Sequence, residues 1–104
     1  MRALIDTGAS CTCIDPQVVQ ALNLTPTGVI TVHTPSTGST PHLTNQYDID
    51  LVLLNPRLNL TIGAIPVTEA NLRVQGIDAL IGRDVLANCL LVYDGQSGIF
   101  SLAF

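Results

Sequence analysis

The apolar residues of this chain come in short runs, and turn-forming residues interrupt these runs about every eight to twelve residues. Ile, Val, Leu and Thr dominate the runs, whereas Gly, Pro and Asn separate them. Runs of this kind are typical of β-strands in a sandwich or barrel and are too short for long helices. The sequence therefore predicts a mainly β fold with one or two short helices.

Length and composition indicate one globular domain over residues 1–104. The chain is 47% hydrophobic, which is sufficient for a single core. Four Lys and Arg residues stand against eight acids, so no basic surface is available to bind nucleic acid. The apolar runs are far shorter than the about 20 residues that cross a bilayer, so we expect no membrane association. No apolar leader follows Met1, and we expect a cytoplasmic protein.

The three cysteines, Cys11, Cys13 and Cys89, are an odd number and a poor disulfide framework. We interpret them as small buried hydrophobic residues in a reducing compartment, in preference to a metal site or a thiol nucleophile. The only two histidines, His33 and His42, flank a polar stretch, and we expect both to face solvent.

Periodicity and turn residues place the expected elements along the chain. Asp15 can cap a helix whose first residue is Pro16. The polar stretch at residues 34–41 predicts the mobile tip of a hairpin. Strands are expected at residues 3–6, 11–14, 29–33, 47–53, 58–62, 66–68, 90–93 and 99–104, and helices at 16–22 and 83–88.

The most informative segment is ALIDTGAS at residues 3–10. Its apolar residues anchor a turn in the core, Gly8 lets another backbone approach closely, and the hydroxyl of Thr7 can lock the turn. Asp6 stands at the end of the strand. Beside a second carboxylate it would share a proton, so that one carboxylate activates water while the other protonates a carbonyl oxygen. Taken alone, the segment favours an aspartate that merely opens a turn.

A second segment, IDALIGRDVL at residues 77–86, changes this balance. Apolar residues lead into Gly82, and Arg83 and Asp84 then open a helix. One interpretation packs this strand-to-helix element under the Asp6 turn, with Gly82 permitting the close approach. The other is an ordinary helix start with Asp84 near its N-terminus.

LIDTGA at residues 4–9 followed 75 residues later by ALIGRD at residues 79–84 resembles the retroviral-type aspartic proteases, or retropepsins. The likeness covers most of the chain and is nearest to the single-domain retropepsin-like proteins of bacteria. It implies a closed acid-protease β barrel with a flap hairpin, in a domain that lacks the first strand or strands of the family.

The resemblance also implies roles for individual residues. Asp6 matches the catalytic aspartate, and Thr7 matches the threonine whose hydroxyl bonds to its counterpart in the other subunit. The matching active-site scaffold is Thr7, Gly8 and Ala9; the matching substrate-binding positions are Gly8, Ser10, Val32, the flap tip Ser36, Thr37, Gly38 and Ser39, and Leu80 and Ile81; the matching structural positions are Gly82, Arg83 and Asp84.

The mechanism needs two carboxylates, but this chain has one Asp-Thr-Gly turn. None of the other acids follows an apolar strand into such a turn. A homodimer, in which a two-fold axis brings Asp6 of each chain together, is therefore required. The resemblance implies an aspartic endopeptidase that takes an extended polypeptide with apolar residues at the scissile bond, and that needs no metal or cofactor.

The chain departs from the viral pattern in four places. Ser10 replaces a common aspartate, the expected flap holds a single glycine, only five residues precede Asp6, and one sheet edge is left unpaired. Two alternatives remain open: a peptide-binding or dimerisation module of the same fold without turnover, and a plain β domain with a coincidental Asp-Thr-Gly.

Overall fold

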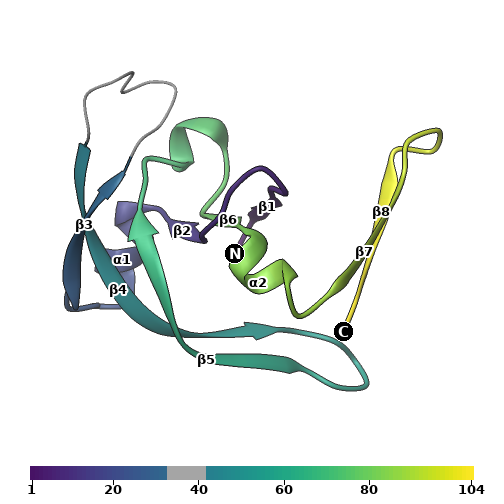
Figure 1. Ribbon diagram of the computed structural model, residues 1–104, viewed down its shortest axis with the longest axis horizontal. Helices are drawn as coiled ribbons and strands as arrows, with labels where there is room; N and C mark the ends of the chain where they lie inside the picture. Colours follow the sequence, from purple (N-terminus) through teal and green to yellow (C-terminus); the bar gives the residue numbers. More distant parts are fainter. Residues whose placement is uncertain (33–41) are drawn as a thin grey trace.

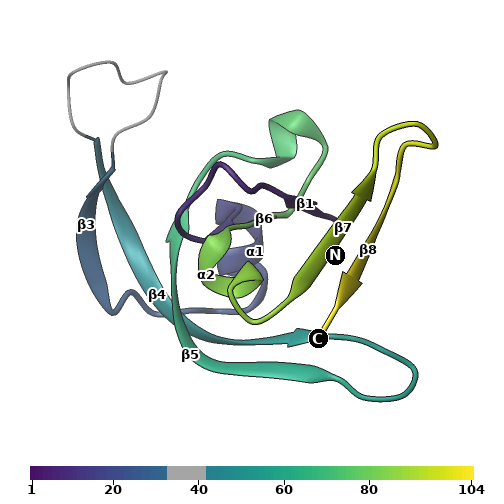
Figure 2. The same cartoon turned by 45° about the vertical axis from the view of Figure 1, so that its right-hand side comes forward.

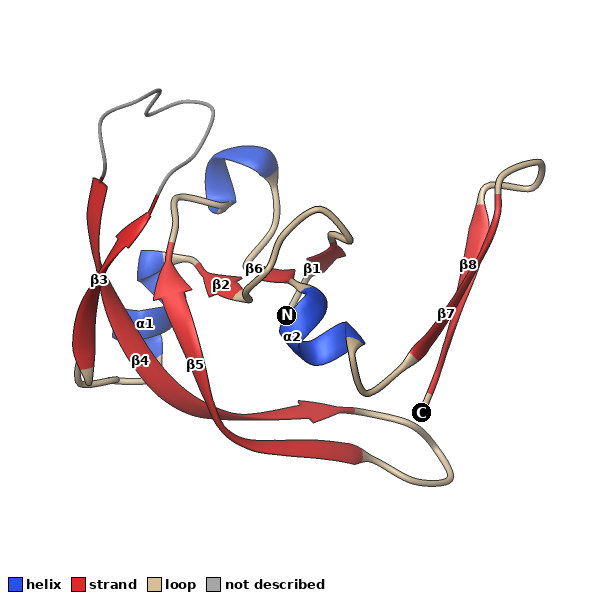
Figure 3. Ribbon diagram, in the orientation of Figure 1, coloured by secondary structure: helices blue, strands red, loops and turns tan. Residues whose placement is uncertain are grey.

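The computed structural model describes residues 1–32 and 42–104, and this part of the chain is mainly β (Figures 1 and 3). The prediction of a mainly β fold with short helices is confirmed. The elements are β1 (Ala3–Ile5), β2 (Cys13–Ile14), α1 (Pro16–Ala21), β3 (Gly28–Val32), β4 (His42–Leu53), β5 (Leu60–Glu69), the 3-10 helix η1 (Arg73–Gln75), β6 (Ala79–Ile81), α2 (Arg83–Leu86), β7 (Leu90–Asp94) and β8 (Ile99–Ala103). The expected flap tip, Ser36 to Ser39, lies outside the described residues.

Six strands form a sheet that curls into a half-barrel, in the order β1-β6-β2-β5-β4-β3 (Figure 1). β1 pairs with β6 in parallel, and β2 lies between β6 and β5. β3 and β4 pair antiparallel, as expected for the two strands of the flap hairpin. The core lies within the curl and contains Ile14, Val19, Tyr47, Ile65, Val67, Ala79, Ile81 and Val85.

Helix α1 begins at Pro16, as the sequence predicts, and ends at Ala21, one residue before the predicted end. The side chain of Asp15 accepts a hydrogen bond from the backbone N–H of Gln17, and Pro16 occupies the first turn, where its missing N–H is not needed. Val18 and Val19 are buried, so one face of this short helix packs against the core.

The two strands expected at residues 58–62 and 66–68 are one continuous strand, β5. A bulge between Ile49 and Leu51 shifts the register of the β4–β5 pair. Opposite this bulge, Ala64 adopts a positive φ of 52°, and its N–H donates to Oδ1 of Asp50 at 2.9 Å. The bulge bends the hairpin without ending it, which the local pattern of Gly and Pro could not reveal.

Strands β7 and β8 form a two-stranded sheet that stands apart from the larger one (Figures 1 and 2). Its turn is closed by the backbone bond from Gly98 N to Asp94 O and by the Asp94 side chain, which accepts from the N–H of Gln96. The closing hairpin expected from the sequence is confirmed. Both of its faces carry exposed apolar side chains, including Val92, Tyr93 and Phe100.

Candidate active site

The Asp6 turn (residues 6–9) follows the end of β1 and presents a partly exposed carboxylate. The backbone N–H of Asp6 donates to Ile81 O at 2.9 Å, which continues the β1–β6 pairing into the turn. The N–H of Ala9 donates to Asp6 O at 3.2 Å, and the N–H of Gly8 donates to Oδ1 of Asp6 at 2.9 Å. The turn therefore holds both the backbone and one carboxylate oxygen of Asp6.

Gly8 leaves room for this arrangement of the Asp6 carboxylate. A Cβ at Gly8 would lie 3.1 Å from Oδ1 of Asp6, which is tighter than an ordinary contact. A larger residue would push the carboxylate away from the position that its own backbone N–H stabilises.

The β6–α2 connection packs against the Asp6 turn, as the sequence predicts. The N–H of Arg83 donates to Ala9 O at 2.8 Å. A Cβ at Gly82 would lie 2.6 Å from the backbone C and O of Cys11, so only glycine allows the two segments to touch. The expected close approach at Gly82 is confirmed.

Arg83 binds the Asp6 turn, whereas Asp84 binds the segment that follows it. Nη1 of Arg83 donates to Thr7 O at 3.0 Å. Asp84 accepts from the hydroxyl of Thr12 at 2.8 Å and from its backbone N–H at 3.0 Å. The Thr12 hydroxyl also accepts from the N–H of Gly82 at 3.2 Å.

Thr12 is a site residue that the sequence analysis did not identify. Its exposed fraction is 0%. Its hydroxyl, the one polar atom of the side chain, donates to Asp84 and accepts from Gly82, and so joins the segment after the Asp6 turn to the start of α2. The available signal was a hydroxyl residue within the otherwise apolar segment CTCI at residues 11–14.

A family model described as aspartyl protease matches residues 1–85, which span the Asp6 turn, strands β3 and β4 and most of α2. The chain belongs to the aspartyl protease family. A search of curated proteins gave no match. The match agrees with the mainly β, half-barrel fold and with the resemblance to retropepsins.

The acidic residues of this aspartyl protease all lie in the described part of the chain, so the hydrogen-bond partners of every carboxylate can be compared. Within residues 1–32 and 42–104, no other acidic side chain hydrogen-bonds to Asp6. Most of them have other partners: Asp15 binds Gln17, Leu72 and Arg73, Asp50 binds Ala64, Glu69 binds Tyr47, Asp78 binds Arg2 and Arg73, Asp84 binds Thr12, and Asp94 binds Gln96.

The remaining expected site positions differ in how far they are exposed. Ser10 is exposed next to the Asp6 turn, whereas Val32 at the end of β3 and Leu80 in β6 are half-buried. Ile81 is buried in the hydrophobic core. Its side chain therefore packs in the core, on the strand that pairs with β1.

The cysteines of the aspartyl protease differ from the prediction at one position. Cys11 is exposed, not buried, because it lies in the connection that leaves the Asp6 turn and precedes β2. Cys13 and Cys89 are partly buried, and burial raises the pKa of both thiols. Sγ of Cys13 lies 3.2 Å from Oγ1 of Thr68. His42 is exposed as expected, and His33 lies outside the described residues.

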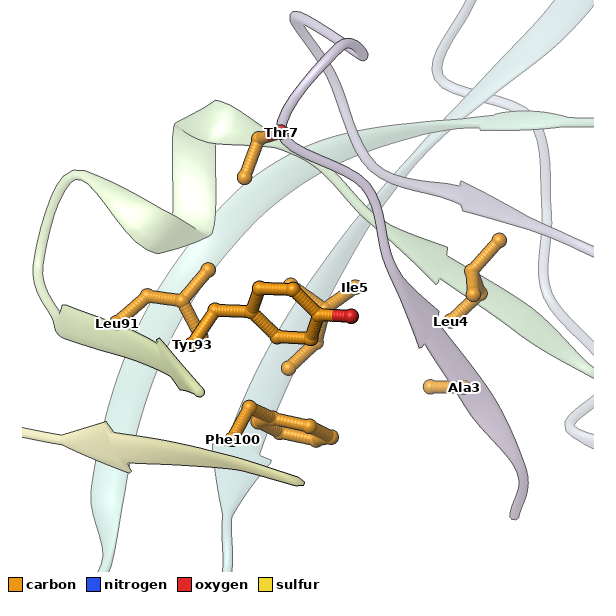
Figure 4. Close-up of a pocket in the computed structure, with 7 residues that line it drawn as sticks. All are labelled: Ala3, Leu4, Ile5, Thr7, Leu91, Tyr93 and Phe100. Atoms are coloured by element: carbon orange, nitrogen blue, oxygen red, sulfur yellow. The ribbon is translucent and has the colours of Figure 1, made fainter. Parts of the chain in front are cut away.

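Two apolar hollows flank Thr7. One, of about 350 Å³, is lined by Thr7, Arg83, Leu86, Ala87 and Leu91. The other, of about 420 Å³, separates the free edge of β1 from the β7–β8 hairpin, and Figure 4 shows the rings of Tyr93 and Phe100 pointing across it toward β1. The free edge of β1 is the unpaired edge that the sequence predicts.

Among residues 1–32 and 42–104, no group of three or more His, Cys, Asp or Glu side chains is arranged to hold a metal ion. No helix in this part of the protein has the length and hydrophobicity to cross a bilayer.

Proposed function

We propose that this aspartyl protease is a homodimeric endopeptidase of retropepsin type in which Asp6 of each subunit forms one catalytic dyad. The observation that carries the proposal is a single Asp-Thr-Gly turn, held by hydrogen bonds, in a chain whose other carboxylates form no hydrogen bond to Asp6 among the described residues. Two carboxylates are needed for the chemistry, so the second comes from an identical chain.

The shared dyad performs acid–base catalysis on a bound water. Two carboxyl groups in contact cannot both ionise, so one is protonated and one is charged. The charged carboxylate takes a proton from water as the water oxygen attacks the peptide carbonyl carbon. The protonated carboxyl gives its proton to the carbonyl oxygen, which yields a tetrahedral gem-diol. The carboxyl that took the proton from water then donates it to the amide nitrogen, and the other carboxylate takes a proton back from one hydroxyl of the gem-diol. The C–N bond breaks to give a carboxylic acid and an amine. No covalent bond to the enzyme forms.

The surface around Thr7 supports pairing with a second copy. Thr7 is exposed, and the hollow beside it is bordered by the apolar side chains of Leu86 and Leu91. The β7–β8 hairpin offers unpaired strand edges and exposed apolar residues, with Tyr93 71% and Phe100 57% exposed. An isolated two-stranded hairpin is marginally stable in water, so association would stabilise this element.

The substrate in this proposal is an extended polypeptide that lies between the Asp6 turn and the flap strands β3 and β4. Gly8, Ser10, Val32 and Leu80 border it, and the resemblance assigns closure over the peptide to the tip residues Ser36, Thr37, Gly38 and Ser39. Because Val32 and Leu80 are apolar, we expect apolar residues on both sides of the scissile bond.

Replacing the carboxylate of Asp6 with an amide tests the assignment. Asp6→Asn should lower kcat/KM for an apolar peptide by about 10²- to 10⁴-fold or more, because general acid–base catalysis is lost. The matched control is Asp48→Asn, an exposed carboxylate on β4, which should cleave like the wild type. Hydrolysis that persists in the Asp6 variant would exclude Asp6 as the catalytic residue.

The free edge of β1 lies beside the apolar hollow between β1 and the β7–β8 hairpin. This arrangement favours one alternative, a peptide-binding module of the same fold without turnover. Peptide binding by fluorescence anisotropy distinguishes the two. Saturable binding with no hydrolysis by dimeric wild type would support the module and contradict the peptidase.

A further inference from the structure

The carboxylate of Asp15 makes more contacts than a helix cap needs. Asp15 is 2% exposed, and its Oδ1 accepts from the N–H of Gln17 at 2.8 Å, which caps α1. Its Oδ2 accepts from the N–H of Leu72 at 3.0 Å and of Arg73 at 2.8 Å. One oxygen therefore serves α1, and the other binds a segment 57 residues further along the chain.

That segment is η1, and it has no side-chain cap of its own. The N-cap residue Leu72, directly before η1, is buried, whereas Val74 in the middle of η1 is 80% exposed. The guanidinium of Arg73 binds the Asp78 carboxylate at 2.9 Å and contacts the side-chain oxygen of Gln17. These contacts anchor η1 to the rest of the fold. Among the described residues, Asp15 is the only side chain that accepts hydrogen bonds from the backbone N–H groups of Leu72 and Arg73.

The position of η1 gives this anchor a consequence for the site. Figures 1 and 2 both show the helical turn between β5 and β6 beside the segment that follows β1, which contains the Asp6 turn. The segment after η1 leads directly into β6, which carries Leu80 and pairs with β1. A shift of η1 would therefore move the entry to β6 and with it Leu80, which borders the peptide in the proposed function.

We propose that Asp15 is a positioning residue for peptide binding, because its second carboxylate oxygen fixes η1 beside the Asp6 turn and at the entry to β6, which carries Leu80. This inference rests on the proposed peptidase function. Asp15 acts through η1 and does not touch the reacting atoms. Peptide binding depends on it, whereas the chemical step at Asp6 does not.

The substitution Asp15→Ser separates the two duties of the side chain. The serine hydroxyl still accepts from Gln17 and caps α1, since serine is among the preferred N-cap residues. It is too short to reach Leu72 and Arg73, so only the η1 anchor is lost. The matched control is Asp50→Ser, which removes a carboxylate bond to the backbone N–H of Ala64 in the β4–β5 bulge.

Two measurements on the full chain test the proposal. Amide hydrogen exchange by NMR should show Leu72 and Arg73 exchanging about tenfold or more faster in Asp15→Ser, with Val19 and Leu22 in α1 unchanged. KM for a cleaved peptide should rise about tenfold while kcat stays within about twofold of wild type. Asp50→Ser should leave both kinetic constants unchanged.

The outcomes separate this inference from the proposed function. Unchanged exchange at Leu72 and Arg73, or an unchanged KM, overturns the role of Asp15 while wild-type cleavage still stands. An equal loss of kcat and kcat/KM also overturns it, because it would place Asp15 in the chemical step. Absence of cleavage by the wild-type dimer overturns the proposed function and this inference together.

Discussion

At the scale of single residues, the Asp6 turn depends on two glycines for different reasons. Gly8 leaves space for the carboxylate of Asp6, whose Oδ1 would lie 3.1 Å from a Cβ at this position. Gly82 leaves space for backbone, because the connection before β2 passes directly over it at Cys11. A carboxylate can rotate away from a new methyl group, but packed backbone cannot, so the second glycine is the less replaceable for the fold.

Gly82→Ala should therefore destabilise the protein by about 1–3 kcal/mol, because the added Cβ would lie within 2.6 Å of Cys11 backbone atoms. Urea unfolding followed by circular dichroism measures the change. Gly28→Ala in β3 is the matched control, since its Cβ would meet nothing within 4 Å, and it should be neutral or slightly stabilising. Equal stabilities of the two variants would contradict the close approach.

At the scale of elements, η1 is held by two carboxylates whose pKa values are lowered in the fold. Burial alone would raise the pKa of Asp15, but backbone N–H groups, that of Arg73 first, outweigh burial and lower it below 3.8. The pKa of Asp78 is also lowered, by the N–H of Arg2 and then by the guanidinium of Arg73. Both groups therefore favour the folded state when they are ionised.

The sign of the resulting pH dependence follows from linkage. A carboxyl group with a lowered folded pKa stabilises the protein fully above its unfolded pKa, and this contribution is lost as pH falls through the folded value. The free energy of unfolding should fall below about pH 4, and this fall should be shallower in Asp78→Asn. Urea titrations at a series of pH values measure it, and an identical acid dependence in wild type and variant would contradict the prediction.

At the scale of the whole molecule, the proposed enzyme has one Asp-Thr-Gly turn in each chain and therefore one carboxylate of the dyad. The turn that carries Asp6 is partly exposed, and the hollow beside Thr7 includes Leu91 of the β7–β8 hairpin. This hairpin stands apart from the larger sheet (Figure 2). Under the proposal, an identical copy would supply the second carboxylate and cover this apolar surface in one isologous contact.

Leu91→Asp should weaken this association by about tenfold or more, since it places a charge in the hollow beside Thr7. Sedimentation across a concentration series measures the dimer dissociation constant, and activity should fall in proportion to the remaining dimer. Leu54→Asp is the control, because Leu54 is 84% exposed in the β4–β5 connection and lies outside both hollows. Two variants with the same dissociation constant would place the interface elsewhere.

Local structure was predictable from the sequence because short-range sterics and hydrogen bonds determine it. The cap at Asp15, the closing hairpin, and strands β3 and β4 with their alternating apolar and polar residues each depend on neighbours a few residues away. The pairing of LIDTGA with ALIGRD was also readable, since glycine at residue 82 signals close backbone contact and family resemblance supplied the partner segment.

The sequence by itself thus determined a β-rich chain of aspartyl protease type, and it predicts a catalytic role for Asp6 together with a second carboxylate. Only the tertiary structure decided that β5 is continuous, that Thr12, in the segment after the Asp6 turn, binds Asp84, and that Asp15 anchors η1. The physical reason is sequence distance: each of these contacts joins backbone or buried polar groups far apart in the chain. Such groups must find partners once they are buried, but no local pattern states which partner they find.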